Sequence, residues 1–138
     1  MLSMPRPIKL WIEKMLRRGA VYLVDFGRRY QSNIGKRRPA VILSAQGYLD
    51  IVEQLQYQSV LVIPLTTQCL DNPVNLLRSK IVQRDRLQKA SEAIINWSCS
   101  VDVKNIDLET GALLTLHSSE LKELEEKYAL YCGISIGA

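Results

Sequence analysis

The chain has 138 residues, of which 47% are hydrophobic and 23% are charged, and its formal net charge is +4. This length and composition are typical of one globular domain with enough apolar residues to form a core without a metal or disulfide staple, and they exclude a generally disordered chain. We therefore expect residues 1–138 to form a single domain.

The cysteines and the apolar segments indicate where the protein resides. Cys69, Cys99 and Cys132 are odd in number and far apart, which argues against a disulfide framework and against a zinc site. The apolar cluster from Ile8 to Leu16 contains charged residues and does not read as a signal peptide. No apolar run reaches the length of a membrane span. We expect a cytoplasmic protein with no membrane partner.

Charge is unevenly distributed along the chain. Residues 1–49 contain ten lysines and arginines but two acidic residues, a net charge of +8, whereas residues 90–138 contain three lysines and eight acidic residues, a net charge of −5. The basic half indicates a polyanionic partner that carries phosphate groups. A solvated basic surface explains the charge equally well.

The first half of the chain begins with a helical pattern and continues with strands. Apolar residues recur at helical spacing over Pro7–Arg18, which predicts an amphipathic helix that packs on the domain. Ala20–Phe26 has the pattern of a strand, and a polar, basic loop follows over 27–37. Arg38–Ser44 is predicted as a second strand, with Pro39 near its start, where a missing N–H is tolerated.

The middle of the chain is predicted to contain two further strands. A connection over 46–57 with a helical turn leads to Ser59–Thr66, which is largely apolar and is expected to be buried on both faces. Asn75–Arg78 is a weak fourth strand. The stretch from Arg78 to Lys89 is a second basic patch, with five basic residues and one acidic residue.

The last third of the chain ends in a helix. We expect a strand over Ala93–Ser100, a turn or short helix over Asp102–Ile106 and a short strand over Gly111–Leu116. Ser118 or Ser119 is expected to cap the terminal helix, which Gly133 ends. Its expected apolar stripe is Leu121, Leu124, Tyr128 and Tyr131. Five or more short strands with a terminal helix predict a mainly β fold, a partly open barrel covered by helices.

The residue types present leave few kinds of chemistry. The single histidine, His117, excludes a two-histidine ribonuclease mechanism and is better explained as a surface or capping residue. The acidic residues of the terminal helix follow a solvated face, so we expect no metal and no cofactor. Arginine, hydroxyl and backbone groups remain, and these suffice to cleave RNA, because RNA carries its own nucleophile, the 2′-OH, beside the scissile phosphate.

Three segments carry a family likeness. They are Arg18–Asp25, Ser32–Ser44 and Val62–Gln68. In this order and at these separations, with a Leu/Glu-rich terminal helix, they resemble the MazF/PemK (CcdB-like) toxin family, whose pattern is R-G-D-V-Y-x-x-D-L, then G-x-x-R-P-x-x-V-x-S, then P-I/L-T-S/T-Q. The likeness spans residues 17–136 and leaves residues 1–16 as an N-terminal helical extension.

The resemblance implies a fold, an activity and partners. The fold implied is a small SH3-like, CcdB-type β-barrel with an N-terminal and a C-terminal helix. The activity implied is that of the toxin of a type II toxin–antitoxin system, a metal-independent endoribonuclease that cleaves single-stranded RNA by 2′-OH attack. The partners implied are single-stranded RNA, a cognate antitoxin protein and a second copy of the chain in a homodimer.

The resemblance also implies roles for individual residues. The catalytic arginine of the family falls on Arg38 and its catalytic threonine on Thr66, and both are expected to bind the reacting phosphate. The residues expected to contact the RNA strand are Arg28, Arg29, Ser32, Gly35, Lys36, Arg37, Gln68, Trp97 and Ser98. The alternative interpretations are a solvated arginine at position 38 and a threonine at position 66 that only caps a strand.

The sequence departs from the family pattern in several places, and these leave alternatives open. Ala20 replaces an aspartate, and Asn33 and Ile34 stand where Glu-Gln is common. Residues 96–100 lack the arginine of the family's Gln-x-Arg-Thr segment, and Trp97 or Ser98 is a candidate substitute through stacking or hydrogen bonding. A catalytically impaired module that binds RNA, DNA or an antitoxin on the same fold is therefore an alternative. A gyrase-directed CcdB-like toxin is a third.

Overall fold

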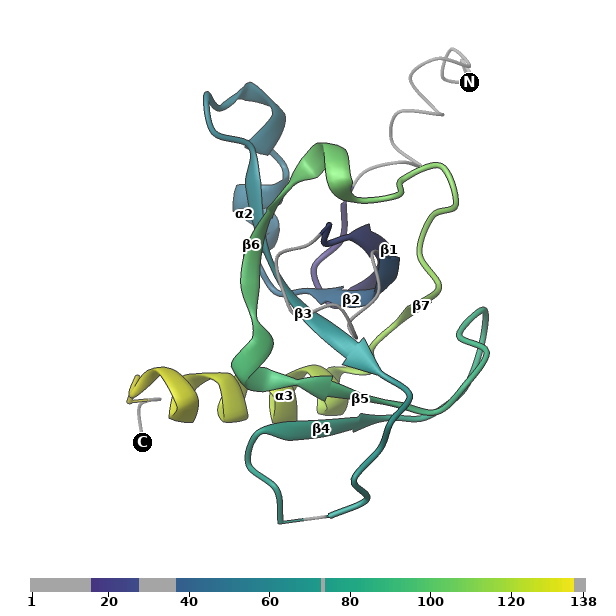
Figure 1. The fold of residues 1–138 in the computed structure, drawn as a ribbon. Helices are drawn as coiled ribbons and strands as arrows, with labels where there is room; N and C mark the ends of the chain where they lie inside the picture. The colour runs from purple at the N-terminus through teal and green to yellow at the C-terminus, as the bar shows by residue number, and fades with distance from the viewer. Residues whose placement is uncertain (1–15, 28–36, 73, 136–138) are drawn as a thin grey trace, which may run out of the picture.

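The structure is a computed structural model that describes residues 16–27, 37–72 and 74–135. Its main feature is a sheet of short antiparallel strands (Figure 1). The strands are β1 (Ala20–Asp25), β2 (Arg37–Ile42), β3 (Ser59–Thr66), β4 (Arg78–Ile81), β5 (Ser91–Ile94), β6 (Cys99–Asp102) and β7 (Leu114–Thr115). The helical elements are α2 (Gln46–Leu49), α3 (Ser118–Cys132) and the 3-10 turns η2 (Val52–Gln54), η3 (Ile95–Trp97) and η4 (Val103–Asn105).

The strands form one curled sheet in the order β4-β5-β3-β2-β1-β7, with β6 also paired to β3. Strand β3 pairs with β2 along one edge and with two different strands along the other. Its first half, Ser59–Val62, pairs with β6, and its end, Leu65 and Thr66, pairs with β5. Because β5 and β6 diverge from this shared strand, the sheet bends into a half-barrel (Figure 1).

Two apolar clusters fill the two sides of the curled sheet, as alternation of side chains along its strands requires. The first cluster takes Ala40 and Ile42 from β2 and Val60 and Val62 from β3. The second cluster lies on the opposite face of the same strands, includes Val41, and packs against α3. The strand β3 is therefore buried on both faces, as its apolar sequence predicted.

Helix α3 covers the β4–β5 end of the sheet (Figure 1). Leu124 is 0% exposed and belongs to the second cluster, and Leu121 and Tyr128 pack against it. Tyr131 is 51% exposed, so its predicted place in the buried stripe is wrong. The predicted serine cap is also wrong, because His117 occupies the N-cap position and its backbone N–H donates to Glu120 Oε1 at 2.8 Å.

Most predicted elements are confirmed within a few residues. The predicted C-terminal end of α3 is one of them, because Gly133 ends the helix in the left-handed conformation, with φ of 73°. The strand predicted over Ala20–Phe26 is β1, that over Arg38–Ser44 is β2, and that over Ser59–Thr66 is β3. The helix predicted over Pro7–Arg18 lies almost wholly outside the described residues.

Two predicted strands need correction. The strand expected from Asn75 begins only at Arg78, because the Asn75 side chain accepts a hydrogen bond from the Leu77 N–H at 2.9 Å and holds a turn there. The single strand expected over Ala93–Ser100 is two strands separated by η3. The chain must turn at this point because β5 and β6 pair with different halves of β3.

Candidate active-site groove

Strands β2 and β3 bring the two predicted catalytic residues to the same groove. The β2–β3 register pairs Ala40 with Pro64 and Ile42 with Val62. The paired stretch ends at Ala40 and Pro64, each two residues from Arg38 on β2 and Thr66 on β3. Arg38 and Thr66 both line the groove described next, and Arg38 Nη1 donates to the carbonyl oxygen of Leu65, the neighbour of Thr66.

A groove of about 260 Å³ opens at this point and is here called the Arg38 groove. Its lining comes from β2, β3, β4, β5 and η3. The lining residues are Arg37, Arg38, Pro39, Leu65, Thr66, Thr67, Gln68, Arg78, Ile94 and Trp97. Three arginines and two threonines among these residues make it a site suited to an anion.

The Arg38 guanidinium has few partners within the described residues. Its Nη1 donates to the carbonyl oxygen of Leu65 at a long 3.5 Å, and its Nε is buried without a hydrogen-bond partner. Burial lowers the pKa of Arg38 from its ordinary value, although an arginine stays charged in a protein. A half-buried cation with an unsatisfied donor is poised to receive an anion with two oxygens.

Four other arginines of the described chain form ion pairs with carboxylates: Arg18, Arg37, Arg78 and Arg84. Arg18 pairs with Glu125 at 3.4 Å, and Arg37 pairs with Asp107 at 2.7 Å. The hydrogen bonds from the Thr110 hydroxyl and the Thr110 backbone N–H, and to a smaller extent the one from Arg37, lower the pKa of Asp107. Arg37 thus lines the groove with an ion-pair partner, whereas Arg38 has no ion-pair partner among the described residues.

Thr66 presents an oriented hydroxyl to the groove. Its Oγ1 accepts a hydrogen bond from the backbone N–H of Gln68 at 3.1 Å. A hydroxyl has one proton to donate, and accepting this hydrogen bond does not use it. The Gln68 side chain is at the exposed rim of the groove.

A buried glutamate supports the far wall of the groove. Glu92 is 4% exposed, and its carboxylate accepts from Arg78 Nη1 at 3.0 Å and from the backbone N–H groups of Leu70 and Asp71 at 3.0 and 3.1 Å. Burial alone would raise the pKa of Glu92, but these hydrogen bonds lower it below its ordinary value. Glu92 therefore stays ionised and fixes Arg78.

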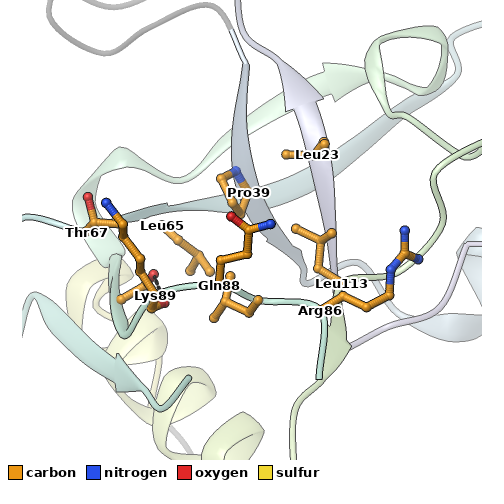
Figure 2. A pocket seen from close by; sticks show the side chains of 10 residues that line it. Leu23, Pro39, Leu65, Thr67, Arg86, Gln88, Lys89 and Leu113 are labelled. Atoms are coloured by element: carbon orange, nitrogen blue, oxygen red, sulfur yellow. Dashed lines mark hydrogen bonds between the residues drawn. The ribbon is translucent and has the colours of Figure 1, made fainter. Parts of the chain in front are cut away.

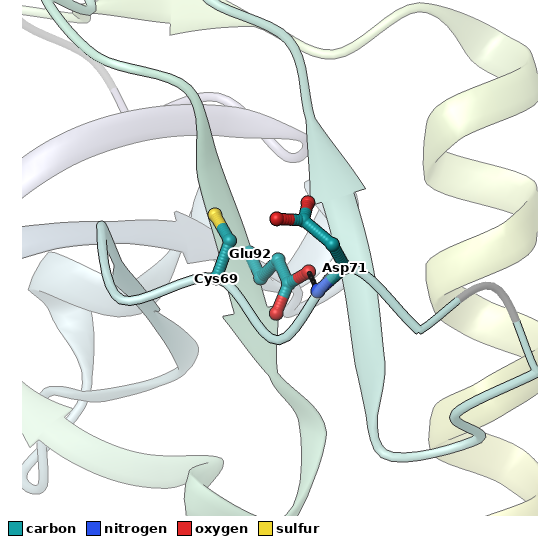
Figure 3. A group of neighbouring side chains, drawn as sticks. All are labelled: Cys69, Asp71 and Glu92. Carbon is teal, nitrogen blue, oxygen red and sulfur yellow. Dashed lines mark hydrogen bonds between the residues drawn. The ribbon is translucent and has the colours of Figure 1, made fainter.

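Cys69 and Asp71 lie beside Glu92 and give the three a grouping that resembles a metal site (Figure 3). The three donors already bonded to the Glu92 carboxylate compete with any cation. Burial, followed by the nearby charges of Glu92 and Asp71, raises the pKa of the Cys69 thiol, which disfavours the thiolate a metal needs. Of the three residues, Glu92 is the one that contacts Arg78.

An apolar pocket of about 350 Å³ adjoins the Arg38 groove and shares Pro39, Leu65 and Thr67 with it (Figure 2). Its remaining lining residues are Leu23, Arg86, Leu87, Gln88, Lys89, Ser91 and Leu113. Figure 2 shows the Gln88 side chain between Lys89 and Arg86. The pocket thus combines aliphatic side chains with polar groups.

The structure brings together several of the residues singled out from the sequence. Arg37, Arg38, Thr66, Gln68 and Trp97 all line the Arg38 groove. Ser98 is half-buried next to Trp97 but is not among the lining residues, and its N–H donates to the Ile95 carbonyl at 3.2 Å. The other predicted contacts lie outside the described residues: Arg28, Arg29, Ser32, Gly35 and Lys36.

Sequence reasoning missed Arg78 as a groove residue. The basic patch over Arg78–Lys89 was a signal, but it did not distinguish one arginine from another. Arg78 reaches the groove because β4 pairs with β5 and β5 pairs with the end of β3.

In the described ranges, no helix has the length and apolar character needed to cross a membrane.

The fold is shared with solved toxin structures. MazF (Form-I) from Deinococcus radiodurans is 17% identical, with a TM-score of 0.66 over 87% of this chain and 98% of that chain. MazE-MazF (Form-II) from Deinococcus radiodurans is 17% identical, with a TM-score of 0.63, and the match covers 88% of this chain and 98% of that chain. An endoribonuclease in complex with its cognate antitoxin from Mycobacterial species is 15% identical, with a TM-score of 0.61, and the match covers 89% of this chain and 98% of that chain.

These likenesses confirm the fold class expected from the sequence, a mainly β, CcdB-type curled sheet with a C-terminal helix. No curated protein matches the chain in sequence. The profile of the PemK-like, MazF-like toxins of type II toxin–antitoxin systems matches residues 17–131. The chain therefore belongs to the PemK/MazF toxin family of type II toxin–antitoxin systems.

Proposed function

We propose that this toxin is a metal-independent endoribonuclease that cleaves single-stranded RNA in the Arg38 groove. The observation that carries the proposal is the Arg38 guanidinium, which is half-buried, lines the same groove as Thr66 and has a buried Nε without a partner in the described chain. A phosphodiester supplies the two oxygens that such a guanidinium binds as a fork.

The proposed reaction uses the nucleophile that RNA itself carries. The 2′-oxygen forms a bond to phosphorus as the P–O5′ bond breaks. The 2′-OH loses its proton, and the departing O5′ gains one. The products are a 2′,3′-cyclic phosphate and a 5′-hydroxyl. Arg38 stabilises the extra negative charge on the phosphoryl oxygens, and the Thr66 hydroxyl donates a further hydrogen bond to them.

The apolar pocket supports a nucleotide substrate over a simple phosphate. It shares Pro39, Leu65 and Thr67 with the groove, so a group bound there lies next to the phosphate at Arg38. A nucleobase has flat apolar faces and a polar edge. The aliphatic side chains suit the faces, and Gln88 and Lys89 suit the hydrogen-bonding groups.

The proposed partners are a cognate antitoxin protein and a second copy of the chain. Solved structures with the same fold include MazE-MazF and an endoribonuclease in complex with its cognate antitoxin, which supports an antitoxin partner here. Leu130, Tyr131 and Ile134 expose apolar side chains near the end of α3, which supports a protein contact such as a homodimer. We propose that residues 1–138 form one domain.

The decisive experiment is incubation of the purified protein with a long single-stranded RNA in EDTA. Wild type and Lys122→Ala, an exposed change on α3, should both cleave, and Arg38→Ala should not. The products should carry 5′-hydroxyl and 2′,3′-cyclic phosphate ends. Cleavage by Arg38→Ala at the wild-type rate would contradict the assigned site.

A second candidate function is RNA binding without cleavage. The observation that favours it is the segment 96–100, where the sequence has no arginine and Trp97 takes a place in the groove. Intact RNA in the cleavage experiment, together with salt-sensitive binding by the wild type, would establish this second function.

A further inference from the structure

We propose that Arg78 is a second phosphate-binding arginine of the Arg38 groove, held in place by Glu92, and that it binds a phosphate of single-stranded RNA next to the one at Arg38. This inference rests on the proposed function. It assigns to β4 the arginine contact that residues 96–100 do not supply.

The position of Arg78 is fixed from three sides. Its Nη1 donates to Glu92 Oε1 at 3.0 Å and to the carbonyl oxygen of Gln68 at 3.3 Å. Its own carbonyl oxygen accepts from Lys127 Nζ of α3 at 2.6 Å. The contact with Gln68 joins Arg78 directly to the segment that follows Thr66, so the two sides of the groove are held together.

Arg78 retains donors that these contacts do not use. Within the described chain, both of its side-chain hydrogen bonds involve Nη1, which leaves Nε and Nη2 available. A guanidinium has five N–H donors and binds carboxylate and phosphate at different edges. Because Arg78 lines the groove with Arg38 and Thr66, its free edge is within reach of a strand bound there.

Glu92 acts here through Arg78 and has the role of a positioning residue. Its side chain is 5% exposed, and it also accepts from the backbone of the 70–71 segment. A fixed guanidinium loses less conformational freedom when it binds a ligand than a solvated one does. The ion pair therefore prepares Arg78 for a phosphate.

Arg84 provides a matched control outside the groove. The side chains of Arg78 and Arg84 are both 20% exposed, and each pairs with a glutamate, Glu92 for Arg78 and Glu120 for Arg84. Replacing either arginine removes one charge and one buried ion pair. Only Arg78 lines the groove.

The test measures binding of a mixed-sequence, single-stranded 2′-O-methyl RNA, which has no attacking hydroxyl, by fluorescence anisotropy over a range of salt concentrations. Arg78→Gln should weaken binding by about tenfold or more, as expected for one charge-assisted contact. It should also reduce the slope of log K against log salt by about 0.7, the share of one phosphate in a single strand. Arg84→Gln should leave affinity and slope unchanged.

Two further variants separate binding from folding. Arg78→Lys keeps the charge but loses the fork, so it should keep the salt slope and recover part of the affinity. Glu92→Gln should weaken binding less than Arg78→Gln, because the guanidinium remains. Thermal unfolding of each variant reports stability independently.

The outcomes distinguish this inference from the proposed function. If Arg78→Gln and Arg78→Lys lose stability but bind RNA with the wild-type affinity and salt slope, Arg78 is purely structural and the inference is overturned. If the wild type binds RNA but does not cleave it, only the cleavage proposal fails. If the wild type neither binds nor cleaves RNA, both fail.

Discussion

The backbone N–H of Gln68 donates to Thr66 Oγ1 at 3.1 Å, and this hydrogen bond does not use the Thr66 hydroxyl proton. We predict that Thr66→Val, which removes the proton at nearly constant volume, lowers kcat by about 10²-fold, the usual effect of losing one donor to the transition state. Thr66→Ser should stay within a few-fold of wild type. Steady-state cleavage of single-stranded RNA measures both, and equal kcat values for Thr66→Val and wild type would contradict the role.

Arg38 should be needed for activity but not for stability. Its buried Nε has no partner in the described chain, so Arg38→Met removes a desolvated charge without leaving a carboxylate unpaired. We predict an inactive protein with a Tm equal to or above that of wild type. Cleavage assays and thermal unfolding of the same sample provide the two measurements.

The control for this prediction is Arg84→Met. Arg84 bonds to Glu120 through both terminal nitrogens, and the Glu120 side chain is 17% exposed. Removal of Arg84 leaves that carboxylate without its partner, which should lower the free energy of unfolding by about 1–3 kcal/mol. A large loss of stability in Arg38→Met would show that Arg38 has a structural partner after all.

Trp97 should contribute to RNA affinity by stacking. The indole lines the Arg38 groove at the corner formed by η3. Base–aromatic stacking contributes about 1–3 kcal/mol per base. We predict that Trp97→Ala weakens binding of single-stranded RNA by a corresponding factor and that Trp97→Phe retains most of the affinity. Equal losses in both variants would indicate that the indole N–H or its packing matters and that stacking does not.

The stability of the protein should fall on acidification through Glu92. Burial raises the pKa of Glu92, but the hydrogen bonds from Leu70, Asp71 and Arg78 outweigh it and lower the folded-state pKa below the ordinary 4.5. A carboxyl group with a lowered pKa stabilises the fold above its unfolded-state pKa, and this contribution is lost as pH falls through the folded-state pKa.

We therefore expect the free energy of unfolding to decrease as pH falls from about 4.5 downward, the ordinary carboxyl range. Glu92→Gln should be less stable than wild type at neutral pH and should lose less stability on acidification. Urea unfolding at a series of pH values measures both slopes. Parallel curves for the two proteins would exclude Glu92 as a source of the acid sensitivity.

The packing of α3 on the sheet should contribute much of the stability. Leu124 is 0% exposed within the second apolar cluster. We predict that Leu124→Ala lowers the free energy of unfolding by about 2–5 kcal/mol through lost burial and the cavity left behind. Lys122→Ala, an exposed change on the same helix, should have little effect on the free energy of unfolding.

Local sequence features were enough to predict several elements and the two central residues. A β-type run predicted β1, a largely apolar run predicted β3, and apolar spacing with Gly133 predicted α3, because these signals depend on neighbours close in the chain. The Arg-Pro and Pro-Leu-Thr motifs singled out Arg38 and Thr66 through a family likeness. Nothing local indicated that the pairing of β2 with β3 brings them to one groove.

Other features were decided only by tertiary structure, because they depend on pairing between distant segments. The strand predicted over residues 93–100 divides at η3 since β5 and β6 pair with different halves of β3. The sequence shows many arginines, but only the fold determines that Arg84 finds a carboxylate while the Nε of Arg38 stays unpartnered in the described chain. Arg78 joins the groove for the same reason. The charge of an arginine can be read from the sequence, but its partner and its burial depend on how strands from distant parts of the chain pair.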